Sequence, residues 1–234
     1  MEVIARVKTK DQFDALKESG FKGDIISSVK SGLATCGFFA DNFDELAILI
    51  EEKKKSEMRD FRIFAGELLY SYNKEAINFF KELVPQIEFI APSELTLDEL
   101  KKLEKNADIK FAYKIYGHQL LMITNQCFKK NYFKCEKEAG RNLNSQEFIK
   151  FKNESGSYLA LNECSECKTR IYNAVPLYML DKLDEFSDSK VLLDFTVETK
   201  EEIKNVLKDF NSETLKTLPK AEEISRGHYY KGID

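Results

Sequence analysis

The sequence lacks any run of about 18 apolar residues, the length that a helix needs to span a bilayer. It begins Met1-Glu2-Val3-Ile4-Ala5-Arg6, with neither a basic segment followed by an apolar one nor a cleavage site of small residues. These absences argue against a membrane helix and a secretory signal, so we expect a cytoplasmic protein. Thiols stay reduced there, and clustered cysteines more often bind metal than form disulfides.

A large charge imbalance is also absent. The chain has 234 residues, 36 of them Lys or Arg and 40 Asp or Glu, for a net charge of −4. A charge of this size does not draw the whole molecule to nucleic acid, although it is compatible with a local basic patch.

The familiar hydrolase motifs are missing too. The sequence contains no His-Glu-x-x-His zinc motif and no Gly-x-Ser-x-Gly turn, and its two histidines, His118 and His228, form no Cys–His dyad that the sequence fixes. The residues themselves therefore do not indicate a peptidase of a common class.

Four of the five cysteines lie between residues 117 and 176, and they are the strongest chemical signal in the chain. Cys127 and Cys135 form a Cys-x7-Cys pair, and Cys164 and Cys167 form a Cys-x2-Cys pair after a gap of 28 residues. A Cys-x2-Cys pair places two sulfurs about one metal-ligand separation apart, and the upstream pair can complete a four-thiolate shell. The flanking residues are mostly polar or charged, which disfavours a packing role. A shared metal or iron–sulfur site is predicted, with disulfides or unrelated thiols as the alternatives.

Four thiolates without histidine suit either tetrahedral zinc or an iron–sulfur cluster. The spacing slightly favours a cluster, because zinc ribbons usually use two tight Cys-x2-Cys pairs and this chain has one. Cys36 is far away in sequence, and we interpret it as a lone loop or core thiol.

Strand-like and helix-like segments alternate up to residue 116, which predicts a parallel sheet. Only one further strand of this parallel sheet is expected later in the chain, so the sheet has fewer than the eight strands of a standard barrel. The fold prediction is therefore α/β, with a parallel-sheet, partial or irregular TIM-barrel-like domain that is open, or completed by unrecognised strands or by a partner chain. The segment at residues 32–37 is expected to be a loop. The expected strands are residues 3–7, 24–28, 61–65, 87–91, 109–116 and 191–195.

The alternation stops at Gly117. Residues 119–156 show no clean period and are expected to form a loop-rich insert held by its cysteines, followed by a strand at residues 156–161. We predict three parts: a βαβ joining region at residues 1–55, a barrel-like domain at 56–210 with the cysteine-rich insert at about 117–176, and a linker and C-terminal tail at 211–234.

Two residues near predicted strand ends are catalytic candidates, because α/β folds place their chemistry at the carboxyl ends of strands. His118 directly follows a predicted strand, and can act as an acid–base group, bind a phosphate or carboxylate, or be structural. Glu198 also lies near a strand end, as do Glu67, Glu94 and Asp194, and these acids can form a carboxylate site.

A mixture of basic and aromatic residues near the cysteines indicates nucleic-acid contact, although neighbouring glutamates dilute it. Arg226 and His228 in the closing segment either contact RNA or pin the tail to the body of the protein. The candidate contacts are Lys129, Lys130, Lys134, Lys168, Arg170, Arg226 and His228.

Several segments in order resemble peptidase family U32, the collagenase-like peptidases, over roughly residues 60 to 234. The resemblance is carried by Glu94-Leu95-Thr96-Leu97-Asp98-Glu99-Leu100, Tyr116-Gly117-His118-Gln119-Leu120-Leu121-Met122 leading into Cys127, Cys164-Ser165-Glu166-Cys167, Ile171-Tyr172-Asn173-Ala174-Val175-Pro176-Leu177, Asp194-Phe195-Thr196-Val197-Glu198 and Arg226-Gly227-His228-Tyr229-Tyr230-Lys231-Gly232.

The resemblance implies a barrel-like domain and, in several members, oxygen-independent hydroxylation of ubiquinone precursors or of bases in RNA. Some members carry a four-cysteine cluster, so Cys127, Cys135, Cys164 and Cys167 are the implied ligands of a 4Fe–4S cluster, with zinc as the alternative. The expected function is assistance in hydroxylating a nucleobase of tRNA or rRNA. The alternatives are a collagenase-like peptidase that uses His118 and Glu198, and a non-catalytic module stapled by zinc. RNA and a second family member that completes the barrel are the expected partners.

Overall fold

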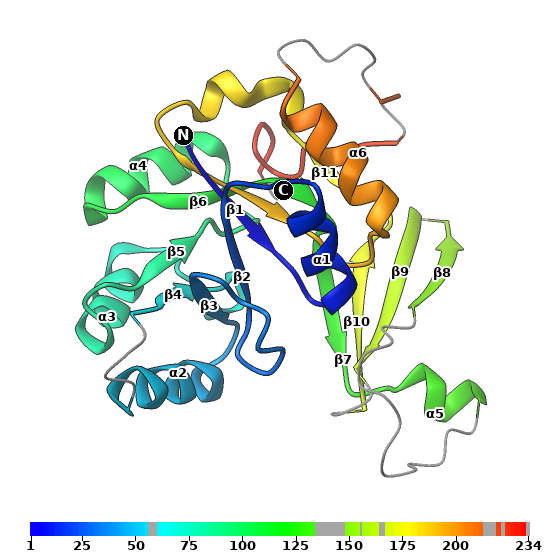
Figure 1. Ribbon diagram of the computed structural model, residues 1–234, viewed down its shortest axis with the longest axis horizontal. Coiled ribbons are helices and arrows are strands. Elements are labelled where there is room, and N and C mark those ends of the chain that lie inside the picture. The colour runs from blue at the N-terminus through cyan, green and yellow to red at the C-terminus, as the bar shows by residue number, and fades with distance from the viewer. Residues whose placement is uncertain are drawn as a thin grey trace. The chain divides into compact units, whose positions relative to one another are not determined.

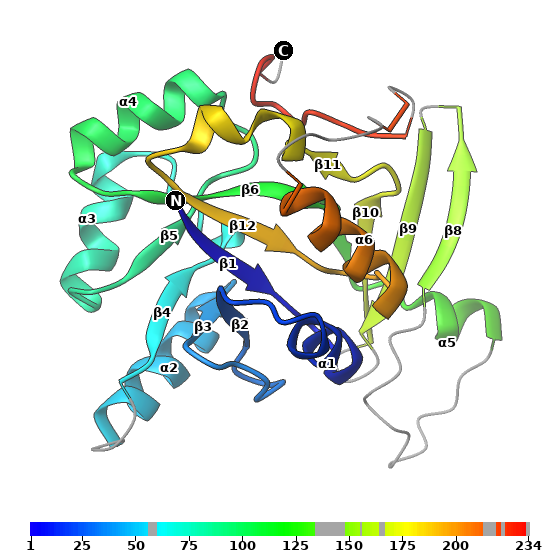
Figure 2. The ribbon, with the colours of Figure 1, turned by 45° about the horizontal axis from the view of Figure 1, so that its top comes forward.

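The computed structural model describes residues 1–55, 60–133, 148–154, 156–163, 167–212, 219–220 and 223–232. The chain divides into two compact units. The first comprises Met1–Gly117, Tyr178–Leu218 and Arg226–Asp234, and the second comprises His118–Leu177 and Pro219–Ser225. Figures 1 and 2 show the elements of both units.

The first unit contains, within its described residues, a closed barrel of seven parallel strands in the order β6-β12-β1-β2-β3-β4-β5, which a β5–β6 pairing closes (Figure 1). The short strand β11 (Leu177–Tyr178) adds to β6. The barrel strands are β1 (Glu2–Arg6), β2 (Asp24–Ser28), β3 (Gly37–Ala40), β4 (Arg62–Ala65), β5 (Glu88–Ile90), β6 (Phe111–Gly117) and β12 (Lys190–Asp194).

The closed ring confirms the predicted TIM-barrel-like α/β fold and corrects the expectation of missing strands. The sequence analysis found six of the seven strands and missed β3, which follows the predicted loop at residues 32–37. All seven strands come from this chain, three of them from residues 1–55, so closure needs no strand from a partner.

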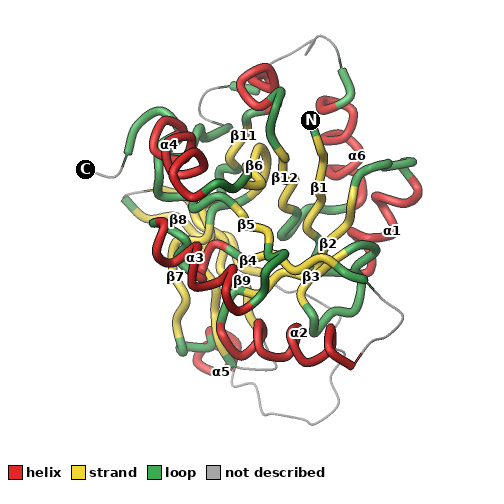
Figure 3. Tube along the Cα trace, turned by 90° about the vertical axis from the view of Figure 1, so that its left-hand side faces the viewer, coloured by secondary structure: helices red, strands yellow, loops and turns green. Residues whose placement is uncertain are grey.

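Helices alternate with the barrel strands and surround them in Figure 3. Three of them, α1, α4 and α6, begin with capping boxes in which Thr9, Thr96 and Thr199 accept a backbone N–H of the first turn. Within the described residues, no helix has the length and apolar character required to cross a membrane. The helical elements of this unit are α1 (Lys10–Glu18), α2 (Phe43–Lys55), the 3₁₀ turn η1 (Glu67–Leu69), α3 (Lys74–Leu83), α4 (Leu97–Ala107), the 3₁₀ segment η2 (Leu180–Phe186) and α6 (Lys200–Phe210).

One side chain from each barrel strand fills the interior of the barrel. All seven side chains are buried, and burying a large aliphatic or aromatic side chain contributes roughly 1.5–3 kcal/mol. The barrel is therefore packed at this level. The seven residues are Ile4, Ile26, Phe39, Phe64, Ile90, Ala112 and Leu192.

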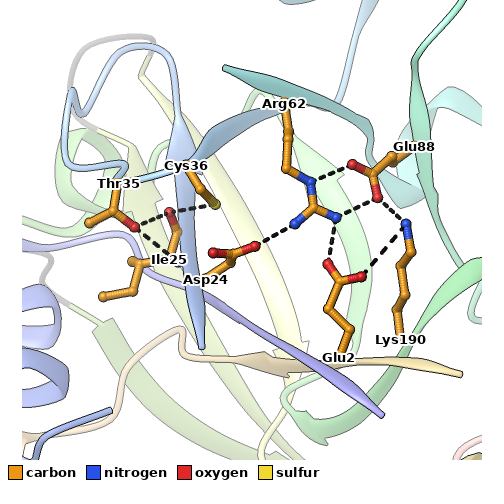
Figure 4. A network of polar contacts seen from close by, with 8 residues as sticks. All are labelled: Glu2, Asp24, Ile25, Thr35, Cys36, Arg62, Glu88 and Lys190. Atoms are coloured by element: carbon orange, nitrogen blue, oxygen red, sulfur yellow. Dashed lines mark hydrogen bonds and ion pairs between the residues drawn. The ribbon is translucent and has the colours of Figure 1, made fainter. Parts of the chain in front are cut away.

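A network of opposite charges links the amino ends of five barrel strands (Figure 4). Arg62 forms ion pairs with Glu2 at 2.6 Å, with Asp24 and with Glu88, and Lys190 also pairs with Glu88. Each of these residues is the first of its strand. Burial alone raises the pKa of Glu88, but hydrogen bonds from Arg62 and Lys190 outweigh burial and lower it. Because this end of an α/β barrel usually serves stability, we assign the network a structural role.

The second unit holds a four-stranded antiparallel sheet, within its described residues, in the order β7-β10-β9-β8. This corrects the expectation of a loop-rich segment at residues 119–156, because β7 and β8 both fall inside it. The elements are β7 (Leu120–Thr124), α5 (Phe128–Phe133), β8 (Phe148–Asn153), β9 (Gly156–Glu163) and β10 (Lys168–Asn173).

The C-terminal segment docks on the first unit. The Arg226 guanidinium donates to the Tyr178 carbonyl at 2.7 Å and to both carboxylate oxygens of Asp181. The buried Tyr229 hydroxyl donates to the Lys114 carbonyl at 2.8 Å, and Leu97 N–H donates to the Tyr229 carbonyl. These contacts favour the interpretation in which Arg226 pins the tail.

Candidate functional site

The carboxyl end of the barrel carries four charged side chains above the apolar layer. Arg6 and Asp194 are the last residues of β1 and β12, Lys114 lies within β6, and Glu67 follows β4. Arg6 is 6% exposed, Lys114 3% and Asp194 1%. Charged residues are rarely this deeply buried unless they are paired, and this edge of an α/β barrel is where active sites form.

The four side chains form a closed ring of alternating charge, which we call the mouth ring. Arg6 Nε donates to Asp194 Oδ1 at 2.7 Å, and Arg6 Nη2 pairs with the other oxygen of the same carboxylate. Lys114 Nζ lies 3.1 Å from Asp194 Oδ2 and 2.9 Å from Glu67. Arg6 Nη2 closes the ring at 3.8 Å from Glu67 Oε2. Each cation therefore contacts both acids.

Asp194 and Lys114 of the ring stay charged at neutral pH. Burial alone raises the pKa of the Asp194 carboxyl, but Arg6 and Lys114 outweigh burial and hold it well below its usual range. Burial alone lowers the pKa of the Lys114 ammonium, but Glu67 and Asp194 outweigh burial and raise it. Asp194 and Lys114 therefore act as fixed charges and do not exchange protons near neutrality.

The sequence analysis named the two acids of the ring as strand-end carboxylates and missed its two cations. The available signal was the position of Lys114 in Phe111-Ala112-Tyr113-Lys114-Ile115-Tyr116, where one charge interrupts an apolar strand. Arg6 gives the same signal at the end of β1.

The two catalytic candidates lie in different units. Glu198, in the first unit, is 6% exposed, and its Oε2 accepts the backbone N–H groups of Thr196 and Val197, the latter at 2.9 Å. His118, in the second unit, is 7% exposed and has Nδ1 2.8 Å from the Asn173 carbonyl. Both contacts anchor the side chain to a nearby backbone.

The cysteine prediction falls partly within the described residues. Cys127 and Cys167 are described, whereas Cys135 and Cys164 lie outside the described residues. Among the residues with described positions, no group of three His, Cys, Asp or Glu is placed to hold a metal. A site that needs all four cysteines is therefore not tested by this arrangement.

Strand pairing brings the two described cysteine segments to one end of the antiparallel sheet. Thr169 of β10 is opposite Thr124 of β7. Cys127 follows Thr124 by three residues and Cys167 precedes Thr169 by two, so both cysteines lie beyond the same end of these two paired strands. The Thr169 hydroxyl fastens this end, since it donates to the Gln126 carbonyl at 2.7 Å.

Cys127 is buried at this end of the sheet, and its sulfur forms two hydrogen bonds. The residue is 6% exposed. Its thiol donates to Asn162 Oδ1 at 2.9 Å, and its Sγ accepts the Lys130 backbone N–H at 3.5 Å. Cys167 is half-buried and has a φ of 53°, a left-handed conformation that few non-glycine residues adopt.

Cys36 belongs to the barrel and not to this group. It is half-buried, packs against the seven-residue layer inside the barrel, and donates to the Ile25 carbonyl (Figure 4). Burial, followed by the charge of Asp24, raises the pKa of its thiol to about 11, so it is unreactive at neutral pH.

The predicted nucleic-acid contacts are spread over both units. Lys130 is exposed, Lys168 and Arg170 are half-buried on β10, and the side chains of Lys129 and Lys134 are outside the described set. Arg226 holds the tail, and the half-buried His228 has Nδ1 3.3 Å from the Lys231 carbonyl.

Comparison of the chain with protein-family models, with curated proteins and with solved structures found no match.

Proposed function

We propose that the chain is an iron–sulfur protein that assists the oxygen-independent hydroxylation of a nucleobase in RNA. The observation that carries the proposal is the meeting of the Cys127 and Cys167 segments at one end of the antiparallel sheet. Cys135 and Cys164 would complete a four-thiolate set, which is the ligand set of a 4Fe–4S cluster. The alternative occupant of the same set is zinc.

The surroundings of Cys127 support a ligand role over simple packing. A backbone N–H aimed at a sulfur stabilises a thiolate, and such N–H···S contacts tune the potential of a bound cluster. The burial of Cys127 also limits access of water to its sulfur. A thiol placed only to fill space would also be buried, but it would not need the backbone N–H contact.

The reaction class is compatible with a redox centre. With water as the oxygen source, converting a C–H bond of a base to C–OH releases two electrons and two protons. A bound cluster would pass these electrons one at a time to an external electron acceptor. The protein's own residues would supply the cluster ligands and the surface that holds the RNA.

The first test is anaerobic purification followed by an absorbance spectrum and metal analysis of the same sample. We expect a brown protein with a broad band near ~400 nm and several irons per chain. Cys127→Ser should lose the band and most of the iron. The matched control is Cys36→Ser, in the barrel, which should keep both.

The second test addresses the reaction. RNA from cells that lack the gene should contain a nucleoside lighter by one oxygen atom than its counterpart in cells that carry it, and Cys127→Ser should not restore the heavier form. A colourless protein with about one zinc per chain would contradict the proposal and favour a zinc-stapled module.

A further inference from the structure

The antiparallel sheet of the second unit ends in two edge strands, β7 and β8 (Figure 1). Within the described residues, β7 pairs with β10 alone and β8 with β9 alone. Each edge strand therefore turns a row of backbone N–H and C=O groups away from the sheet. Such a row is a template for another β-strand, and proteins commonly protect it with charged side chains.

The strand β8 carries that protection and β7 does not. Lys150 and Lys152 are exposed on β8, so two copies of this edge would place lysines beside lysines. The strand β7 reads Leu-Leu-Met-Ile-Thr, and residues 117–127 contain no Lys, Arg, Asp or Glu in a chain in which these make up 32%. Two copies of β7 can therefore lie side by side without repulsion between like charges.

The exposed side chains of β7 are apolar on both faces of the sheet. Leu121 is 49% exposed, Met122 50% and Ile123 40%. Successive side chains of a strand point to opposite faces, so Met122 lies on one face and Ile123 on the other. A strand added at this edge would cover apolar surface on both faces.

The hydrogen bonds of β10 show which of its residues face β7. The Asn173 N–H donates to the Gln119 carbonyl at 2.9 Å, so Asn173 turns its backbone groups toward β7. Because these directions alternate along an antiparallel strand, Ile171 and Thr169 also face β7.

The residue at the centre of the free edge is Ile123. Met122 is opposite Ile171 and Thr124 is opposite Thr169, so both bond to β10. Ile123 lies between these two pairs and therefore turns its N–H and C=O away from β10. The register shift of this ladder follows Ile171 on the side away from Ile123, so it leaves both flanking pairs regular.

We propose that β7 pairs with β7 of a second copy of the chain, antiparallel, about a two-fold axis at Ile123. The Ile123 N–H of each copy donates to the Ile123 carbonyl of the other, as in a hydrogen-bonded antiparallel pair. The two four-stranded sheets then form one continuous sheet across the axis. A five-residue edge buries a small area, so we expect a dimer that dissociates on dilution.

Sedimentation velocity of the purified protein over a range of concentrations tests the pairing. The unaltered protein should shift from the mass of one chain, 27.1 kDa, toward twice that mass as its concentration rises. Ile123→Lys places two like charges opposite each other at the axis, and we expect the dissociation constant of the dimer to rise at least about tenfold. The control is Phe148→Lys, which makes a similar change at a residue of β8 that is 46% exposed, and it should dimerise like the unaltered protein.

Amide hydrogen exchange measured by NMR tests the register in the unaltered protein. The Ile123 N–H turns away from β10 in a single chain and bonds to the second copy in the dimer, so its exchange should slow as the protein concentration rises. The Met122 N–H bonds to β10 in both states and is the internal control. Its exchange should not depend on concentration.

Three results would overturn the inference: a protein that stays a single chain at every concentration, dimerisation of Ile123→Lys equal to that of Phe148→Lys, or exchange at Ile123 that ignores concentration in a protein that dimerises. The first result would leave a strand of another protein as the occupant of the edge. The inference is independent of the proposed function, because the pairing needs neither metal nor RNA. A colourless zinc protein that dimerises through β7 would contradict the proposed function alone, and a brown protein that stays a single chain would contradict this inference alone.

Discussion

Four charged side chains of the mouth ring occupy positions where a barrel of this kind usually places apolar ones. Moving a carboxylate or an ammonium group out of water costs several kcal/mol, and ion pairing compensates only when the geometry is good. The ring meets that condition, because both cations contact both acids. Removing one member should therefore cost more than the pair itself contributes, since a buried charge is left unpaired.

Asp194→Asn is the sharpest test of the ring. At neutral pH we expect the free energy of unfolding to fall by about 3–5 kcal/mol, the usual cost of breaking a buried pair. Because the folded-state pKa of Asp194 is lowered, its contribution is present above the unfolded pKa of about 3.9 and is lost as the pH falls toward the folded value. The difference between the two proteins should therefore shrink below about pH 4 in urea unfolding curves.

The control for this substitution is Asp14→Asn, which removes the partner of Lys10 in an exposed i,i+4 pair on α1. Exposed pairs contribute at most about 1 kcal/mol, so this change should leave stability almost unaltered at every pH. A loss for Asp194→Asn as small as that for Asp14→Asn would mean that the ring relaxes or admits water.

At the residue scale, the sequence pointed to the two acids of the mouth ring but not to its two cations. Strand-end positions named Asp194 and Glu67, together with Glu94 and Glu198, because the carboxyl ends of parallel strands follow from strand direction alone. The partnership with Arg6 and Lys114 depends on strand order around the barrel, in which β12 lies between β1 and β6. Local sequence carries no information about that order.

At the scale of elements, the C-terminal segment is the piece whose role the structure clarifies most. Arg226 makes charge-assisted hydrogen bonds to Asp181, and Tyr229 packs among Tyr113 and Phe186. The segment is thus held by a few specific contacts and not by a helix or strand of its own.

Arg226→Met should loosen this segment. Charged hydrogen bonds contribute roughly 1.5–3 kcal/mol, so we expect limited proteolysis to remove the C-terminal peptide at least about tenfold faster. The intact mass of the product identifies the cleavage. His228→Ala, which removes a half-buried ring two residues away that forms no ion pair with Asp181, should leave the rate unchanged. Equal rates for both variants would show that Arg226 does not hold the tail, and a loss of RNA affinity in either would restore the alternative contact role.

The sequence predicted a helix or strand correctly where apolar residues recurred regularly over the whole element, and it failed where they did not. Six of the seven barrel strands were identified in this way. The strand β3 has four residues, β7 is a run of four apolar residues and a threonine, and β8 places exposed apolar and basic side chains next to each other. None of the three therefore shows the apolar–polar alternation of a half-buried strand.

At the scale of the whole molecule, closure of the barrel depends on β3, the short strand that was not predicted from the sequence. Gly37 begins β3, and a Cβ atom there would lie 2.5 Å from the Arg62 carbonyl oxygen of β4. The close approach explains why glycine occupies this position. The β3–β4 ladder is one of the seven that close the ring.

Gly37→Ala should therefore destabilise the barrel by about 2 kcal/mol, because overpacking against a backbone forces the two strands apart. Thermal unfolding followed by circular dichroism measures the loss. Gly232→Ala adds the same methyl group where its nearest neighbour, Thr96 Cγ2, is 3.6 Å away, and it should be nearly neutral. Equal melting temperatures for the two variants would mean that the ladder tolerates the shift.

The pairing of β1 with β12 has a consequence for synthesis of the protein on the ribosome. Arg6 meets Asp194 across 188 positions of sequence. The ribosome adds about 5–20 residues per second, so β12 is completed roughly 10 to 40 s after β1. During that interval the nascent barrel is an open sheet with unpaired edges, which makes it a substrate for chaperones. The antiparallel sheet, built from strands close together in sequence, is not subject to the same delay.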